Sequence, residues 1–250
     1  MRLKLISCEI FYREMCAVLA RSRNQVDVEF LSKGLHDIGA APMRARLQQA
    51  VDGVDGSLYE AILLGYGLCG NGIAGLRARS APIVVPRAHD CITLFLGSSK
   101  RYLRYFQDNP GVYFRTTGWI ERGEGLRQLG AETIQGQTGV GCTLEDLVAK
   151  YGEDNGRYLH EQLGKDRRNY RKLTFIEMGM EPDDRFERRA RAEADRHGWE
   201  FEKTAGDLSM LQRFVDGVWD DKEFLVVEAG ARVVARYDEG IVAAEKADAE

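Results

Sequence analysis

Three cysteines and one histidine follow short apolar runs in the first half of the chain. Cys8 closes KLIS, Cys69 follows AILLGYGL, and His89 and Cys91 follow PIVVPRA. Thiolate and neutral imidazole are the protein ligands that zinc prefers, and short loops could bring four of them around one ion. The pattern predicts a zinc site at Cys8, Cys69, His89 and Cys91, in which three ligands would leave one position open for catalysis.

The same residues allow other kinds of chemistry. Three thiolates could hold an iron-sulfur cluster with one iron open to substrate, although four cysteines are the usual complement. Without a metal, Cys69 or Cys91 could be a nucleophile activated by His89 or by a helix N-terminus. Buried thiols also often only pack. The remaining cysteines are expected to be structural and the remaining histidines solvated: Cys16, Cys142, His36, His160 and His197.

The loop GYGLCGNGIAGL is rich in glycine and follows an apolar run. Gly70, Asn71 and Gly72 could let the backbone approach a ligand or metal and present N-H groups to an anion. The glycines also match the GxGxxG spacing of dinucleotide-binding loops. Only residues 73–80 remain for the crossover helix, which is shorter than that fold needs, so dinucleotide binding is not favoured.

Further candidates lie outside the cysteine segments. In PGVYFRTTGW, Arg115 follows an apolar run and could orient an anionic group. Glu177 and Glu228 end two later apolar runs and could relay protons. Several aromatic residues near Arg115 could wall a pocket, or only pack: Tyr102, Tyr105 and Trp119.

These residues are positioned by alternating strands and helices. Apolar runs predict strands at residues 3–7, 26–31, 61–66, 82–85, 112–115, 173–178, 199–203 and 224–229. Helix-forming stretches cover residues 9–21 and 43–51, the latter entered after Pro42. Short strands that alternate with helices indicate an α/β fold with a largely parallel sheet, in which ligands gather beyond the carboxyl ends of the strands.

The chain is predicted to form two lobes. Residues 1–142 make an N-terminal α/β lobe with the Cys/His cluster, and residues 143–250 make a helical bridge followed by a smaller α/β lobe. The order KLISC, VEF, EAILLGYG is echoed by KLTFI, WEF, EFLVVEAG, which suggests an internal duplication with a cleft between similar lobes. The end from Ala243 is expected to fray or form an exposed helix.

Composition limits the partners and the compartment. The 35 basic and 39 acidic residues are spread along the chain and give a net charge of -4, so nucleic acid is not an expected partner. No segment is apolar for long enough to cross a membrane, and charge returns at Glu9 before a signal-peptide core is complete. Five irregularly spaced cysteines fit a reducing compartment, and we expect a cytoplasmic protein.

The segments GYGLCGNGIAGL, PRAHDCITLFLGSSKRY and PGVYFRTTGWIE resemble the signature segments of the domain of unknown function sixteen thirty-eight family. The likeness covers most of the chain, and the family's recurring cysteine and His-Asp-Cys positions match Cys8, Cys69, His89 and Cys91. The resemblance implies a place in methyl metabolism, because members occur in microbes that handle methylated compounds through corrinoid proteins. The ligand types are also similar to those of zinc methyltransferases of the uroporphyrinogen decarboxylase-like group, whose barrel this chain is too short to form.

We therefore expect a metal-binding protein, with zinc as the metal, that acts on a small-molecule thiol or a methylated, one-carbon substrate. The alternative is a non-catalytic module that holds a metal or iron-sulfur cluster, or serves a corrinoid protein, without turnover. A purely structural role for the cysteines is the third hypothesis.

Overall fold

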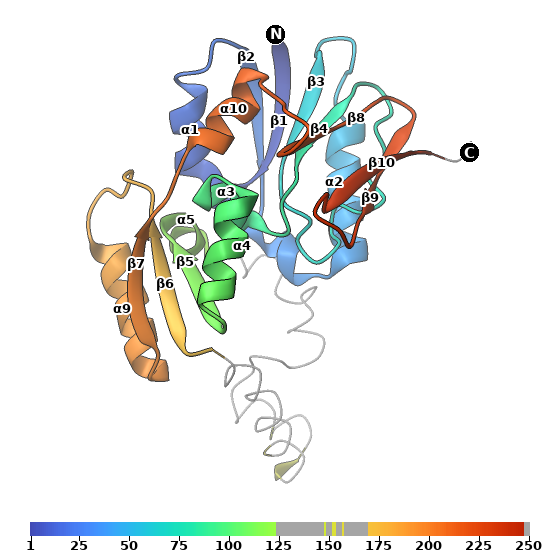
Figure 1. The fold of residues 1–250 in the computed structure, drawn as a ribbon. Coiled ribbons are helices and arrows are strands. Elements are labelled where there is room, and N and C mark those ends of the chain that lie inside the picture. The colour runs from blue at the N-terminus through green and yellow to red at the C-terminus, as the bar shows by residue number, and fades with distance from the viewer. Residues whose placement is uncertain (124–147, 149–151, 154–156, 158–169, 248–250) are drawn as a thin grey trace.

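The first strand, β1 (Arg2–Cys8), lies inside a five-stranded sheet of the computed structural model. The structure describes residues 1–123, 148, 152–153, 157 and 170–247 (Figure 1). The sheet has the order β2-β1-β3-β4-β8, in which β8 alone is antiparallel to its neighbour. The other members are β2 (Gln25–Leu31), β3 (Ala61–Gly65), β4 (Ile83–Pro86) and β8 (Phe224–Val227).

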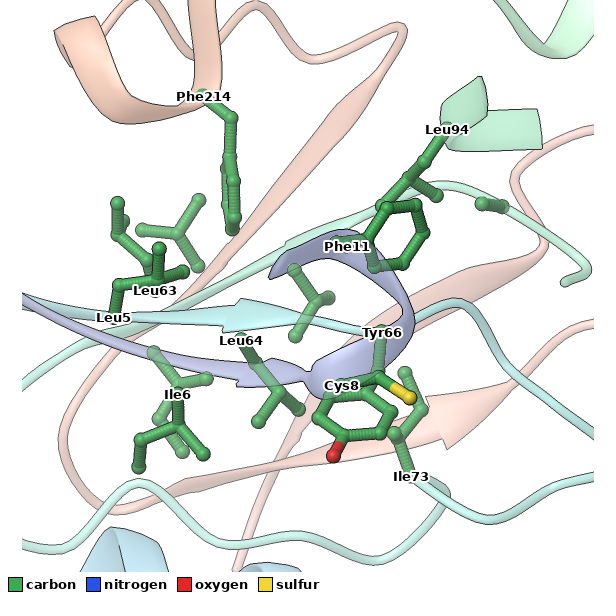
Figure 2. Packing of buried hydrophobic residues seen from close by; sticks show 14 of the residues in the cluster. Leu5, Ile6, Cys8, Phe11, Leu63, Leu64, Tyr66, Ile73, Leu94 and Phe214 are labelled. Atoms are coloured by element: carbon green, nitrogen blue, oxygen red, sulfur yellow. The ribbon is translucent and has the colours of Figure 1, made fainter. Parts of the chain in front are cut away.

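The inner strands of this sheet are apolar because both of their faces are covered. All five residues of β3 and all four of β4 are buried, as expected for parallel strands between helical layers. Figure 2 shows Leu64 and Ile73 beside Cys8 and Tyr66, close to the carboxyl ends of β1 and β3. The main core therefore extends to the edge at which the predicted ligands lie.

Helices cover the two faces of the five-stranded sheet. Across the sheet, the step from β1 to β2 goes one way and the step from β2 to β3 goes the opposite way. Because crossovers between parallel strands are right-handed, α1 and α2 lie on opposite faces of the sheet. Helix α10 packs against α1 and shares its face (Figure 1). The elements are η1 (Glu9–Phe11), α1 (Tyr12–Leu19), η2 (Lys33–Asp37), α2 (Ala40–Asp52) and α10 (Ser209–Asp216).

A second, three-stranded sheet lies beside the first (Figure 1). Its order is β5-β6-β7, all parallel, and helix α9 packs on β6 and β7 over a separate small core that includes Leu173 and Phe175. Two helices of the first half, α3 and α4, lead into it. The elements are α3 (Cys91–Leu96), α4 (Ser99–Asp108), β5 (Val112–Thr116), α5 (Thr117–Glu121), β6 (Lys172–Glu177), α9 (Arg185–His197) and β7 (Glu200–Ala205).

The predicted α/β fold is confirmed, and each of the eight predicted strands is found within a few residues of its predicted limits. The prediction for the C-terminal end is wrong. Residues that were expected to fray or form a helix make β10 (Val242–Lys246), which pairs antiparallel with β9 (Ala231–Ala235). Val242 is fully buried, and this pairing outweighs the helix preference of the Ala/Glu/Lys composition.

The sheets do not follow the predicted division into lobes 1–142 and 143–250. Strand β5 pairs with β6 and β4 pairs with β8, so each sheet contains strands from both predicted lobes. The antiparallel β8 also differs from parallel β3, its counterpart in the proposed duplication, which stays a prediction. The boundary at 142, most of the predicted helical bridge, Cys142 and His160 lie outside the described residues. Within the described part of the chain, no helix is long and apolar enough to cross a membrane.

The strand order creates a natural binding position. From β1 the sheet continues to β2 on one side and to β3 on the other, so the loops that leave β1 and β3 run to opposite faces. Such a switch point opens a crevice at the carboxyl ends of the strands, where open α/β sheets bind their ligands. Cys8 is the last residue of β1, and Cys69 lies four residues after the end of β3.

Candidate metal centre

Cys69 lies in a strained turn beyond β3. Its backbone N-H donates to the carbonyl oxygen of His89 at 2.9 Å, which ties the turn to the segment after β4. Cys69, Gly70 and Asn71 all have positive φ angles, of 47°, 64° and 70°. A left-handed backbone costs a residue with a Cβ atom about 1 to 2 kcal/mol, and such strain clusters at functional sites.

Cys91 is the first residue of helix α3. The side chain of Asp90 caps this helix by accepting a hydrogen bond from the backbone N-H of Ile92 at 2.9 Å. Gly67 passes so close that a Cβ atom there would lie 2.7 Å from the carbonyl carbon of Asp90. Only glycine fits this contact, which holds the turn of Cys69 against the start of α3.

His36 completes the group from the short helix η2, which follows β2. Ser32 fixes the start of η2 by accepting a hydrogen bond from the N-H of Gly34 at 3.2 Å. The ligand atoms of His36, Cys69 and Cys91 all lie within 4.8 Å of one another, and the two sulfur atoms are 3.5 Å apart. This group could hold a metal ion. The Nε2 atom of His36 is buried and has no hydrogen-bond partner among the described residues.

Cys8 lies next to this group without belonging to it. Its thiol is fully buried at the end of β1, and burial raises its pKa, with the nearby His36 opposing the rise. The hydroxyl of Tyr66 is also buried and has no hydrogen-bond partner among the described residues. Its pKa is raised well above the ordinary value by burial and then by Cys8 and the other two thiols.

In the absence of a metal, the pKa values of the thiols and of the imidazole are shifted in different directions. The contact with Cys69 lowers the pKa of Cys91 to about 5, against the effect of burial and with help from His36. Burial lowers the pKa of His36, but the thiols of Cys8 and Cys91 outweigh it and raise the pKa to about 10. The pKa of Cys69 rises through the contact with Cys91 and through burial. These opposite shifts favour a Cys91 thiolate beside a His36 imidazolium in the absence of a metal.

The imidazole of this group is therefore His36 and not the predicted His89. The side chain of His89 is exposed, and only its backbone contributes, through the bond to Cys69. Asp90, the next residue, instead turns its side chain inward to cap α3 and to accept a hydrogen bond from the hydroxyl of Tyr102 at 2.8 Å. His36 was expected to be solvated, and that expectation is wrong. Its position just after β2 was the available signal, because the strand-end rule applied to the cysteines also applies to it.

The three ligand residues open onto a cavity of about 400 Å³. Besides His36, Cys69 and Cys91, the cavity is lined by Asp90, Arg115 and residues from α4, β5 and α5. Six of the lining side chains are aromatic: Tyr102, Phe106, Tyr113, Phe114, Trp119 and Tyr170. Tyr102 and Trp119 were among the predicted wall residues. Tyr105 instead contacts Thr174, with 2.7 Å between the two hydroxyl oxygens.

The predicted catalytic residues have separate positions. Arg115 lines the cavity, but its Nε and Nη2 atoms donate to the carboxylate of Glu193 at 2.9 and 2.7 Å. Glu177 does not line this cavity and pairs with Lys203 at 3.1 Å. Glu228 follows the antiparallel β8, whose carboxyl end lies beside the start of β4, at the opposite edge of the sheet from the thiols. The antiparallel direction of β8, which the sequence did not indicate, separates Glu228 from the site.

The predicted backbone ligands form the turn around Cys69. Gly70 and Asn71 are exposed, and the N-H of Gly72 donates to the carbonyl oxygen of Cys69 at 3.3 Å. A Cβ atom on Gly72 would lie 2.3 Å from the sulfur of Met43, so a larger residue would displace this side chain where the turn packs on α2. These contacts explain the glycine-rich loop, and its role in binding an anion stays a prediction.

The fold and the site define an α/β protein with a thiol and imidazole group at the switch point of a mostly parallel sheet. A family model described as "Protein of unknown function (DUF1638)" matches residues 30–215, and the chain belongs to this family. The predicted resemblance is confirmed by this match. No curated protein and no solved structure gave a match to the chain.

Proposed function

We propose that His36, Cys69 and Cys91 bind a zinc ion and leave one coordination position for a small-molecule thiol or a methylated, one-carbon substrate. The observation that carries this proposal is the convergence of two sulfur atoms and one imidazole nitrogen within 4.8 Å, on a histidine whose buried Nε2 atom has no hydrogen-bond partner among the described residues. Two sulfurs bound to one zinc at 2.3 Å in a tetrahedral shell lie about 3.8 Å apart. The 3.5 Å between the sulfurs of Cys69 and Cys91 is close to this spacing.

A zinc ion with an open position can hold a substrate thiolate or activate a bound water. The residues of this chain supply the setting for that chemistry. His36 and the two cysteines face the cavity, and the hydroxyl of Tyr66 offers a donor near the thiols. Cys8 is near enough to His36 to raise its pKa, its own pKa is affected by His36 and Cys91, and it is the candidate for a fourth ligand. Methyl transfer, a corrinoid protein partner and the alternative of a non-catalytic delivery module rest on the family resemblance alone.

Metal analysis of untagged protein purified without oxygen tests this proposal. We expect about one zinc per chain, and loss of most of it in Cys69→Ser and Cys91→Ser, because each change removes a soft ligand. Cys16→Ser is the matched control, since the Cys16 side chain is exposed on α1, and it should keep the metal. A visible absorption band with bound iron would instead indicate an iron-sulfur cluster. Full metal content in both ligand variants would contradict the site.

A second candidate function uses the same residues without a metal. The lowered pKa of Cys91, to about 5, beside His36 is the pattern of an activated cysteine nucleophile. This function would be favoured if the protein is isolated without metal and iodoacetamide alkylates Cys91 rapidly, with a low apparent pKa for the pH dependence of the rate. Protein isolated with zinc and protected from alkylation until a chelator is added would favour the metal site.

A further inference from the structure

The cavity beside the thiols is walled mainly by aromatic rings, and these rings stand at angles to one another. Tyr113 and Tyr170 meet at 65° with centroids 5.1 Å apart, while Tyr102 and Phe106 lie at 24° with centroids 6.0 Å apart. A flat ligand fits best between parallel rings, whereas rings of different orientation around one cavity suit a compact, rounded group. The faces of such rings carry negative potential and attract cations.

The charges at the cavity wall also favour a cation. Arg115 is neutralised by two hydrogen bonds to Glu193, so it is not an open receptor for an anion. The side chain of Asp90 also lines the cavity, and it accepts hydrogen bonds from neutral donors that include the hydroxyl of Tyr102 and the N-H of Ile92.

The rings of this region already bind cations of the protein itself. The guanidinium carbon of Arg115 lies 4.6 Å from the ring centroid of Tyr113, and the ammonium of Lys33 lies 4.8 Å from that of Trp119. Lys33 is in turn paired with Asp37 at 3.7 Å. Both contacts have the geometry of cation-π interactions. Neighbouring rings of the cavity could bind the cation of a ligand in the same way.

We infer that this cavity binds a methylated onium group, a quaternary ammonium or a sulfonium, with the methyl groups against the aromatic rings and Asp90 as the counter-ion. This inference deepens the proposed function, because it names the substrate class of the same site. Methyl groups spread the charge of an onium ion and prevent strong hydration, so an apolar aromatic wall with one carboxylate binds it better than water does. The ligand carbon atoms would lie beside Cys69 and Cys91, which line the same cavity.

Calorimetric titration of the intact, metal-loaded chain with three isosteric probes tests the inference. Choline carries a positive charge, 3,3-dimethylbutan-1-ol is its neutral analogue, and 3,3-dimethylbutanoate carries a negative charge. We expect choline to bind about tenfold more tightly than the neutral alcohol, within the range of a cation held by aromatic faces. Tetramethylammonium and trimethylsulfonium then distinguish the two kinds of onium ion. Equal binding of choline and the alcohol, or a preference for the carboxylate, would overturn the inference.

Two variants locate the binding. Asp90→Asn removes the charge but keeps a side chain that caps helices well, so α3 should persist while choline loses its advantage over the neutral alcohol. Phe106→Leu removes a ring that is 48% exposed, so it should weaken choline binding and leave the fold intact. The matched controls are Asp221→Asn and Tyr237→Leu, whose side chains are exposed outside the cavity. Choline binding that is unchanged in Asp90→Asn and in Phe106→Leu would exclude this cavity.

The outcomes separate this inference from the proposed function. If the zinc content depends on Cys69 and Cys91 but the three probes bind equally, the metal site is supported and the onium site is overturned. Discrimination among the probes in a chain that binds no metal supports the onium site and contradicts the zinc proposal.

Discussion

The two sheets of the molecule differ in whether the polar side chains around them have partners. Around the three-stranded sheet, charged side chains are paired: Arg115 with Glu193 at 2.7 Å, and Lys172 with Glu202 at 2.7 Å. No buried, unpartnered side-chain N or O atom lies on the described strands β5, β6 and β7. At the carboxyl edge of the five-stranded sheet, His36 and Tyr66 each bury such an atom, and so does Trp119 of α5, which follows β5.

This difference separates a supporting sheet from a site for chemistry. His36 links the three unpartnered residues, because its ring centroid lies 5.9 Å from the ring centroids of both Tyr66 and Trp119. A buried polar atom without a partner costs about 1 to 3 kcal/mol, so a cluster of them is stable only when a ligand or the surrounding fold compensates. The strands of the smaller sheet carry paired side chains and part of the cavity wall, and the loops of the larger sheet carry the group that could hold a metal ion.

The largest expected effect comes from breaking a pair at the smaller sheet. Arg115→Gln leaves the carboxylate of Glu193 partly buried and unpaired, and it should lower the free energy of unfolding by about 3 to 5 kcal/mol. Urea denaturation measures this loss, and metal content should not change. Arg188→Gln is the control, because its pair with Asp184 is exposed and should contribute less than about 0.5 kcal/mol. Equal effects of the two changes would contradict a structural role for the buried pair.

A somewhat smaller effect is expected at Glu14, an unpartnered carboxylate away from the thiols on α1. Burial raises its pKa from 4.5 to about 7, so the folded state binds a proton that the unfolded state releases. Its full contribution to stability is present below pH 4.5 and is lost as the pH rises toward 7. Glu14→Gln should therefore raise the free energy of unfolding at pH 8 by about 3 kcal/mol. The two proteins should be equally stable at pH 4, and a constant difference at both pH values would contradict the raised pKa.

The smallest stability effect concerns the strained turn. Cys69→Gly relieves the left-handed backbone at φ 47°, whereas Cys69→Ala removes the same thiol and keeps the Cβ atom. The metal-free glycine variant should be about 1 kcal/mol more stable than the alanine variant, and neither should retain the metal. Thermal unfolding of both variants measures the difference. An alanine variant at least as stable as the glycine variant would show that the turn carries no strain.

The sequence predicted the strands and the thiols better than the complete site. Strand positions follow from apolar runs, and Cys69 and Cys91 follow from their places after β3 and before α3. The histidine beside the thiols differs from the predicted one, because adjacency in His-Asp-Cys favoured His89, whereas helix capping turns Asp90 inward and leaves His89 exposed. The position of Glu228 depended on the direction of β8, which is set by pairing with β4 across about 140 residues and not by any local pattern.

The central claim is that His36, and not His89, joins the cysteines in a metal site. Metal content of His36→Gln and His89→Gln, purified side by side without oxygen, tests it most directly, because the two substitutions are chemically identical. We predict that His36→Gln loses most of its zinc and that His89→Gln keeps about one zinc per chain. Zinc that is retained in His36→Gln and lost in His89→Gln would contradict the site as the structure presents it.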